Sequence, residues 1–260
     1  TFATFPSNYM GLVTADGKLE HYDGLLRMMN PAGELLEDAY DPDSYLSLIA
    51  EATGDFSYLK FPFYRPLGYP EGSYRVGPLA RLNVCDSAGT PEADKELGTF
   101  RQIAGGGKVE GSMYYHYARL IEILFGIERI EELLNHPDVC GDHLIAESYR
   151  ILPEGIGVIE APRGTLFHHY MVDDSGGIER VNLIIASGQN NYAMNRAVTE
   201  VALQHVDGAH LTEPMLNKVE AAVRCYDPCL SCSTHAIGQM PLRVELLDAS
   251  GNMLDVLTRG

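Results

Sequence analysis

Basic residues are scarce in this sequence. Its 260 residues include 19 lysines and arginines against 36 aspartates and glutamates, a formal net charge of −17. Nucleic acids and anionic membrane surfaces repel so acidic a chain, so we expect neither as a partner. Apolar runs fall short of the roughly 20 residues that span a bilayer, and no basic-then-apolar leader precedes Phe2. We therefore expect a cytoplasmic protein with no membrane span.

Cysteine is also rare. The five cysteines are an odd number and only three of them lie close together, which favours a reducing compartment over a disulfide framework. There is no dinucleotide-binding fingerprint and no iron-sulfur spacing. No repeat or low-complexity linker marks a domain boundary. The chain starts at Thr1 without an initiator methionine, and we expect it to lack its true N-terminal part.

Local patterns predict a mixture of strands and helices. Asp-Gly and Pro-Ala-Gly turn signals predict a small meander in residues 9–40, and a capping residue followed by good helix formers predicts a short helix from Ser44. The Pro- and Gly-rich residues 61–78 are expected to form a long ordered loop. Helical spacing of apolar residues predicts one long amphipathic helix between residues 108 and 136.

The second half of the chain alternates between the two patterns. Two strands are expected on either side of the loop "DDSGG", helices over residues 191–205 and 213–225, and a C-terminal hairpin around "DASGN". His168 and His169 are adjacent on a predicted strand and therefore face opposite ways, so we interpret them as packing and surface residues.

The segment "DPCLSCSTH", residues 227–235, carries the clearest chemical signal. Cys229 and Cys232 form a C-x-x-C pair, and three residues separate Cys232 from His235. A free thiol has a pKa of about 8.5, but metal coordination deprotonates it, so such a pair binds soft or borderline cations. Structural zinc bound by Cys225 and these three residues is one interpretation, although zinc sites usually combine two separated ligand pairs. A thioredoxin-like redox pair is less favoured, because such a pair lies between a strand and a helix, whereas this pair follows a helix.

This segment, together with "EAPRGTLFHHY", "NLIIASGQNN", "FPSNYMGLV" and "YRVGPLARLNVCD", resembles the large subunit of nickel-iron hydrogenases. The match is best to the cytoplasmic, bidirectional NAD(P)-linked group. The resemblance implies the α+β, mainly helical large-subunit fold with small β-hairpin and meander elements. It also implies a nickel-iron centre with carbon monoxide and cyanide on the iron, and reversible heterolytic cleavage of dihydrogen.

The resemblance assigns roles to individual residues. Cys229 would be a terminal nickel ligand, and Cys232 would bridge nickel and iron. A thiolate such as Cys229 or the guanidine of Arg163 would take the proton. Arg163 would point its permanent charge at the open metal position. A hairpin arginine in an ion pair is the alternative interpretation. Asp227 would pair with Arg163 or, equally, cap a turn.

Further residues are assigned in the same way. Pro162 and Ala186 would line the cofactor site, and the Ser187 hydroxyl would donate to a cyanide ligand, unless it caps a turn. His235 and the backbone carbonyl of Leu183 would bind a second metal, magnesium or iron, near the mature C-terminus.

One part of the family pattern is missing. The family's centre takes four thiolates, two of them from an N-terminal C-x-x-C pair that this sequence does not contain. We therefore expect a fragment that is inactive alone: residues 1–235 would be the C-terminal part of the large subunit, and residues 236–260 an extension removed on maturation. Expected partners are a small subunit with an iron-sulfur cluster, flavin-containing NAD(P) diaphorase subunits and a maturation endopeptidase.

Other functions remain open at this point. Deazaflavin-reducing and heterodisulfide-linked hydrogenases have similar motifs. A quinone-site scaffold related to respiratory complexes would lack the metal-binding cysteines, and a zinc-stapled interaction module would hold neither nickel nor iron.

Overall fold

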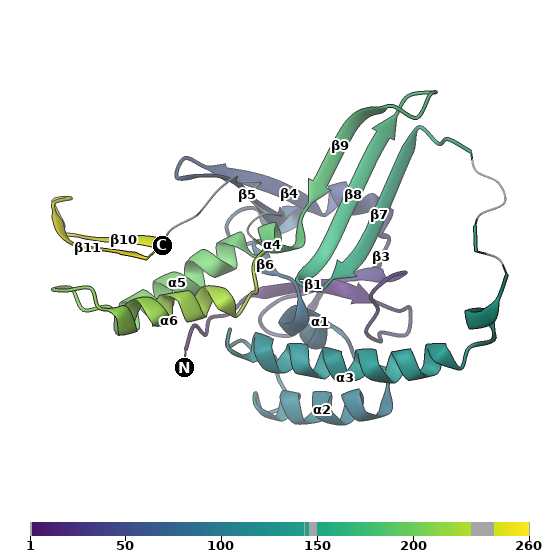
Figure 1. Ribbon diagram of the computed structural model, residues 1–260, viewed down its shortest axis with the longest axis horizontal. Helices are drawn as coiled ribbons and strands as arrows, with labels where there is room; N and C mark the ends of the chain where they lie inside the picture. The colour runs from purple at the N-terminus through teal and green to yellow at the C-terminus, as the bar shows by residue number, and fades with distance from the viewer. Residues whose placement is uncertain (1, 143, 146–149, 230–241, 260) are drawn as a thin grey trace.

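The structure, a computed structural model, describes residues 2–142, 144–145, 150–229 and 242–259. Strands contribute nearly as much of the chain as helices, so the expected α+β mixture is confirmed. A small sheet lies at the centre, a longer three-stranded sheet rises from it, and helices pack below it and to one side (Figure 1). No helix in the described ranges is long and apolar enough to cross a membrane.

The predicted N-terminal meander is confirmed. β1 (Asn8–Val13) pairs antiparallel with β2 (Leu25–Met29), which pairs antiparallel with β3 (Leu35–Tyr40). A short strand, β6 (Tyr74–Arg75), pairs parallel with the other edge of β1. The helix α1 (Pro78–Val84) packs against β1. Every residue of β1 and α1 is buried, so these two elements form the centre of the fold.

The predicted helix from Ser44 is wrong. A 3-10 helix, η1 (Pro42–Ser47), ends three residues after Ser44, and the chain then forms the hairpin of β4 (Ile49–Gly54) and β5 (Ser57–Tyr64). Pairing between the two strands outweighs the helix propensity of the sequence. The expected long loop is therefore also wrong in its first part, because β5 occupies it.

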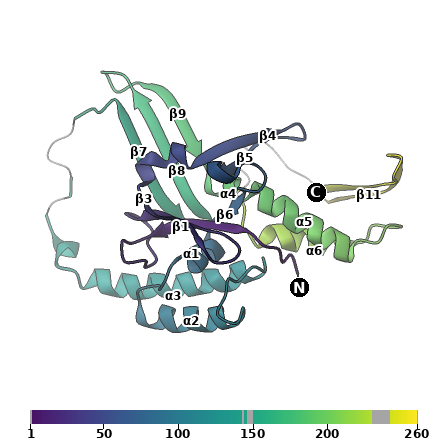
Figure 2. The same ribbon diagram turned by 180° about the vertical axis from the view of Figure 1, so that it is seen from behind.

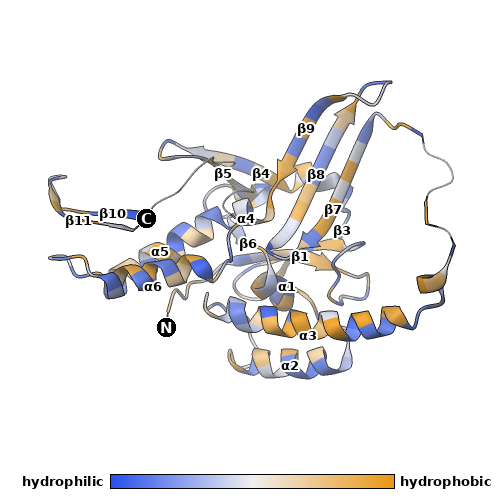
Figure 3. Cartoon of the chain, in the orientation of Figure 1, coloured by the Kyte–Doolittle hydropathy of each residue, from blue (hydrophilic) through white to orange (hydrophobic). Residues whose placement is uncertain are grey.

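The long helix is confirmed as α3 (Tyr114–Leu134), which packs beside α2 (Pro91–Gln102). One face of α3 is buried through Tyr115, Ala118, Ile121 and Phe125. Apolar residues on its other faces are exposed: Leu120, Ile123, Ile127, Ile130, Leu133 and Leu134. Figure 3 shows how much of α3 is apolar, in orange.

The three-stranded sheet contains the predicted "DDSGG" hairpin and one strand more. β7 (Glu154–Ala161), β8 (Gly164–Val172) and β9 (Ile178–Ile184) pair antiparallel in that order. The "DDSGG" loop joins β8 to β9, whereas the chain reverses between β7 and β8 at Pro162 and Arg163. That second turn places Arg163 at the end of the sheet opposite the "DDSGG" loop.

Three helices follow the three-stranded sheet in the described part of the chain. α4 (Ala186–Gln189) follows β9 directly, and the predicted helices are confirmed as α5 (Asn191–His205) and α6 (Glu213–Arg224). The hairpin of β10 (Leu242–Leu247) and β11 (Met253–Arg259) lies apart from the sheets (Figure 2). The remaining elements are two short 3-10 helices, η2 (Arg65–Leu67) and η3 (Pro137–Cys140).

Candidate active site

Several of the residues singled out by the sequence line one cavity of about 260 Å³. It lies where the β7–β8 turn and the link from β9 to α4 meet the segment after α6. Five of its nine lining residues belong to the predicted site: Pro162, Arg163, Ala186, Ser187 and Cys229. The other four are Ala161, Leu166, His168 and Ile185. Three separate segments therefore converge on a cavity whose walls are mostly apolar.

Glycine shapes the turn that carries Arg163. Ala161 pairs with Gly164 across the β7–β8 hairpin, so Pro162 and Arg163 form its tip. Gly164 has φ +140°, and a Cβ there would lie 2.2 Å from the side chain of Val76. Only glycine combines this backbone conformation with so close an approach. The turn is thereby packed directly against the chain between β6 and α1.

Arg163 and Asp227 lie in contact. Nη2 of Arg163 is 3.2 Å from Oδ2 of Asp227, and its Nε donates a hydrogen bond to the backbone carbonyl of the same residue. Asp227 has φ +48°, a left-handed conformation that aspartate tolerates better than most residues. This geometry realises the pairing expected for Asp227. It also fixes the guanidinium at two nitrogens, beside the cavity that Cys229 lines.

Ser187 connects the second segment to the third. Its side chain is 3% exposed, and its Oγ accepts a hydrogen bond of 3.2 Å from the backbone N–H of Cys229. A hydroxyl that accepts one bond still has its own proton to donate. Ser187 therefore fixes the backbone of Cys229 while keeping a donor available.

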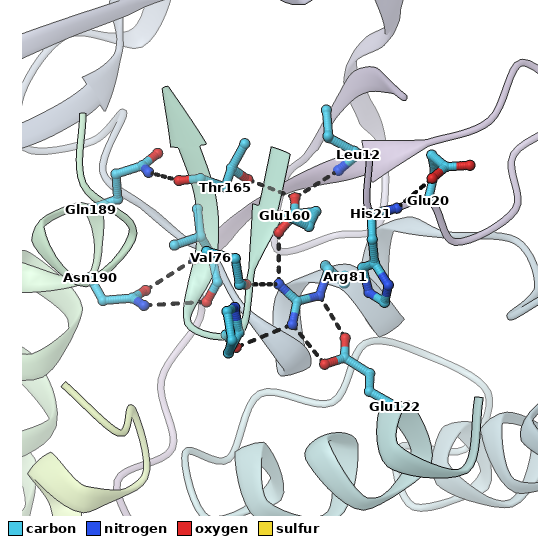
Figure 4. Close-up of polar contacts among 12 residues, drawn as sticks. Leu12, Glu20, His21, Val76, Arg81, Glu122, Glu160, Thr165, Gln189 and Asn190 are labelled. Atoms are coloured by element: carbon cyan, nitrogen blue, oxygen red, sulfur yellow. Dashed lines mark hydrogen bonds and ion pairs between the residues drawn. The ribbon is translucent and has the colours of Figure 1, made fainter. Parts of the chain in front are cut away.

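Two amide side chains that the sequence analysis missed hold this region together. Gln189 accepts a hydrogen bond of 2.9 Å from the Tyr74 hydroxyl and donates to the carbonyl of Thr165. Asn190 accepts from the N–H of Val76 at 3.0 Å and donates to its carbonyl at 3.3 Å (Figure 4). The run "GQNN", which begins four residues after the end of β9, is a sequence signal that could have marked them.

His168 differs from its interpretation as a packing or surface residue. It lines the cavity, and its Nδ1 lies 3.1 Å from the Tyr170 hydroxyl. His169 does face the other way, as expected, where Nε2 lies 2.8 Å from Glu154 and Nδ1 lies 3.1 Å from Tyr45. The alternation along β8 thus separates the two rings.

The other predicted ligands are not brought to this cavity. Leu183 lies on β9 and lines a different cavity of about 270 Å³, beside Glu51 and Lys60. Cys232 and His235 lie outside the described residues. Their assignments remain predictions.

Cys225 does not fit the zinc interpretation. It is fully buried, and its Sγ lies 3.1 Å from the carbonyl of Ala221 and 3.5 Å from Sδ of Met113. Burial raises the pKa of this thiol to about 11, which keeps it protonated near neutral pH. Cys225 is also not among the residues that line the cavity with Cys229.

The cavity suits one side of a thiolate-bound metal centre. The structure holds Cys229 in a disulfide; once reduced, its thiolate would be a soft donor, and Arg163 supplies a fixed positive charge at the same cavity. Within the described ranges, no three His, Cys, Asp or Glu side chains converge on one point. Cys229 would therefore need ligands from outside those ranges to hold a metal.

Comparisons with known proteins agree with this arrangement. The model of the nickel-dependent hydrogenase family matches residues 14–235. The chain is 42% identical over 262 residues to the NAD-reducing hydrogenase HoxS subunit beta of Cupriavidus necator, covering 100% of this chain and 54% of that protein. It is 39% identical to an F420-non-reducing hydrogenase subunit of Methanothermobacter thermautotrophicus, covering 95% of this chain and 52% of that protein.

A solved structure supports the same assignment. The chain superposes on a NAD+-reducing [NiFe]-hydrogenase in the H2-reduced state with a TM-score of 0.85 and 46% identity, covering 89% of this chain and 51% of that one. The chain thus spans about half the length of the curated relatives it matches. The expected large-subunit fold is confirmed, and the chain belongs to the nickel-dependent hydrogenase family.

Proposed function

We propose that this chain forms the C-terminal part of the catalytic subunit of a nickel-iron hydrogenase, which cleaves dihydrogen reversibly and passes the electrons to NAD(P) through partner subunits. The observation that carries the proposal is the single cavity where Arg163, held by Asp227, meets Cys229. The NAD-linked assignment rests on the similarity to the HoxS protein and to the NAD+-reducing enzyme.

In this proposal Cys229 and Cys232 would hold the nickel-iron centre, with the iron carrying carbon monoxide and cyanide. Bound there, the metals would act as Lewis acids that make dihydrogen acidic. Ser187 would direct its hydroxyl proton at a cyanide ligand, while Pro162 and Ala186 close the wall around it.

The chain's own residues would then handle charge and protons. Arg163 cannot give up its proton, so it would act as a fixed positive charge at the cavity wall. After reduction of the disulfide in which the structure holds Cys229, its Sγ would be the base that takes the proton. His235 and the carbonyl of Leu183 would bind the second metal, magnesium or iron.

The proposal also names partners and a location. Electrons would leave through a cytoplasmic complex with an iron-sulfur small subunit and flavin-containing diaphorase subunits. The resemblance to an F420-non-reducing hydrogenase keeps a non-NAD acceptor as the second candidate.

The test is to purify the full-length subunit with its partners and to measure its nickel, iron and zinc content. Hydrogen-dependent reduction of NAD+, NADP+ and coenzyme F420 is assayed in parallel. Nickel and iron together with NAD(P)+ reduction support the proposal. Zinc without nickel and iron would instead support a zinc-stapled module, and reduction of F420 alone would overturn the NAD(P) assignment.

We further propose that maturation removes residues 236–260, which number 260 − 235 = 25. Part of this tail forms the β10–β11 hairpin, which contacts the rest of the chain where Asp255 accepts a hydrogen bond of 2.8 Å from the N–H of Leu211. A hairpin set apart from the sheets can be lost without opening the core.

The active enzyme is therefore expected to end at His235. Intact-mass measurement of purified, hydrogen-oxidising enzyme checks this prediction, with protein from nickel-depleted cells as the control that should keep the tail. A fully active species that still carries residues 236–260 would contradict it.

A further inference from the structure

We propose that Arg81 is a positioning residue for Arg163, acting through the backbone of the β7–β8 turn. This inference rests on the proposed function only where it concerns turnover. The claim that Arg81 holds the backbone of the β7–β8 turn rests only on the contacts around Arg81.

Arg81 is the centre of a buried ionic cluster. It lies on α1 with its side chain 2% exposed, and its Nε and Nη2 each lie 2.6 Å from an oxygen of Glu122 on α3. Its Nη1 lies 2.7 Å from Oε2 of Glu160 at the end of β7 (Figure 4). The guanidinium thus joins three elements, and paired carboxylates are what permit such a charge inside the fold.

The same guanidinium reaches the turn itself. Nη1 donates to the carbonyl of Ala161 at 3.0 Å, and Nη2 donates to the carbonyl of Pro162 at 3.3 Å. These are the two residues immediately before Arg163. Since Pro162 has no N–H, its carbonyl is the only backbone hydrogen-bonding group through which it can be held.

Glu160 is fixed from several sides as well. Its Oε1 accepts hydrogen bonds from the N–H of Leu12 at 2.9 Å and from the Thr165 hydroxyl at 2.8 Å. Burial raises the pKa of the Glu160 carboxyl, and the charge of Arg81 opposes that rise. Arg81 therefore holds residues before the turn directly and Thr165 after it through Glu160. These contacts fix the position of the Arg163 backbone.

Lysine cannot replace this arrangement. One ammonium has three donors at a single point, whereas the guanidinium spreads its donors over Glu122, Glu160 and two carbonyls. Arg81→Lys keeps the charge but should release the turn. A matched control is Arg27→Lys, because Arg27 is also buried, bonds Asp38 and Asp86, and donates to the carbonyl of Val84.

The first experiment is amide hydrogen exchange on the full-length subunit in its complex. Arg81→Lys is expected to speed exchange in peptides covering residues 159–166 by about 10-fold, while Arg27→Lys leaves these peptides unchanged. Unchanged exchange in Arg81→Lys, or an equal increase in both variants, overturns the proposal. Glu122→Gln is the second variant if Arg81→Lys does not fold, with the same direction expected.

The second experiment is a double-variant cycle on hydrogen turnover per nickel. Arg81→Lys should lower turnover by about 10-fold, since small misplacements of a charged group are costly. If Arg81 acts through Arg163, adding it to Arg163→Lys should change turnover by less than about twofold. Fully additive losses overturn the proposal. A parental complex without hydrogen-dependent activity would instead contradict the proposed function. The exchange result would still show whether Arg81 holds the backbone of the β7–β8 turn.

Discussion

Cys229→Ser, made in the full-length subunit, is expected to abolish nickel retention, and so is Cys232→Ser. A serine hydroxyl stays protonated near neutral pH and is a hard donor, so it cannot replace a soft thiolate. The variants are purified with their partner subunits, and nickel per catalytic subunit is measured by elemental analysis.

Cys229→Ser removes the sulfur, and with it the disulfide in which the structure holds Cys229, but it keeps the backbone contact to Ser187. The hydrogen bond at this position comes from the backbone N–H of Cys229 to Oγ of Ser187, and the substitution leaves that bond in place. Loss of nickel would then report on the sulfur atom of Cys229.

Two cysteines supply controls. Cys225→Ser tests the buried thiol nearest in sequence, and Cys140→Ser tests an exposed one. Both should retain parental nickel. Parental nickel in either Cys229→Ser or Cys232→Ser would refute the ligand assignment, and loss of metal in Cys225→Ser would return that thiol to the ligand set.

Site residues in short local motifs could be predicted from the sequence, whereas contacts between residues far apart in the chain could not. Pro162, Arg163, Ser187 and Cys229 occur in short, specific motifs of the sequence, and the fold brings those motifs to one cavity. The contact of Arg163 with Asp227 spans 64 residues, and only the family resemblance suggested it.

The supporting residues could not be predicted in this way. Arg81 reaches Glu122 across 41 residues and Glu160 across 79, and a single arginine or glutamate in a sequence carries no sign of such a partner. Strand pairing likewise decided the segment after Ser44, where local propensity favoured a helix. The helices α3 and α5 could be predicted, because the sequence pattern of a helix lies within the helix itself.

The structure also gives a physical basis for an effect of Arg163 on turnover. Its Nε and Nη2 both bind Asp227, which holds the plane of the guanidinium at the edge of the cavity. A lysine has one nitrogen and cannot keep both contacts while presenting the same face to the cavity. Arg224, by contrast, pairs with Glu220 and is 72% exposed, so Arg224→Lys is a control for the loss of a guanidinium elsewhere.

Arg163→Lys is therefore expected to lower hydrogen turnover by about 10²-fold or more, the scale of losing one preorganised electrostatic group. Metal content should not change, because Cys229 and its bond to Ser187 are untouched. Turnover per nickel, measured beside Arg224→Lys, separates the two effects: a matching loss of nickel would make Arg163 part of metal retention instead. Parental turnover with intact metal would leave Arg163 with its other interpretation, an arginine that only pairs with Asp227 to join the β7–β8 turn to the segment after α6.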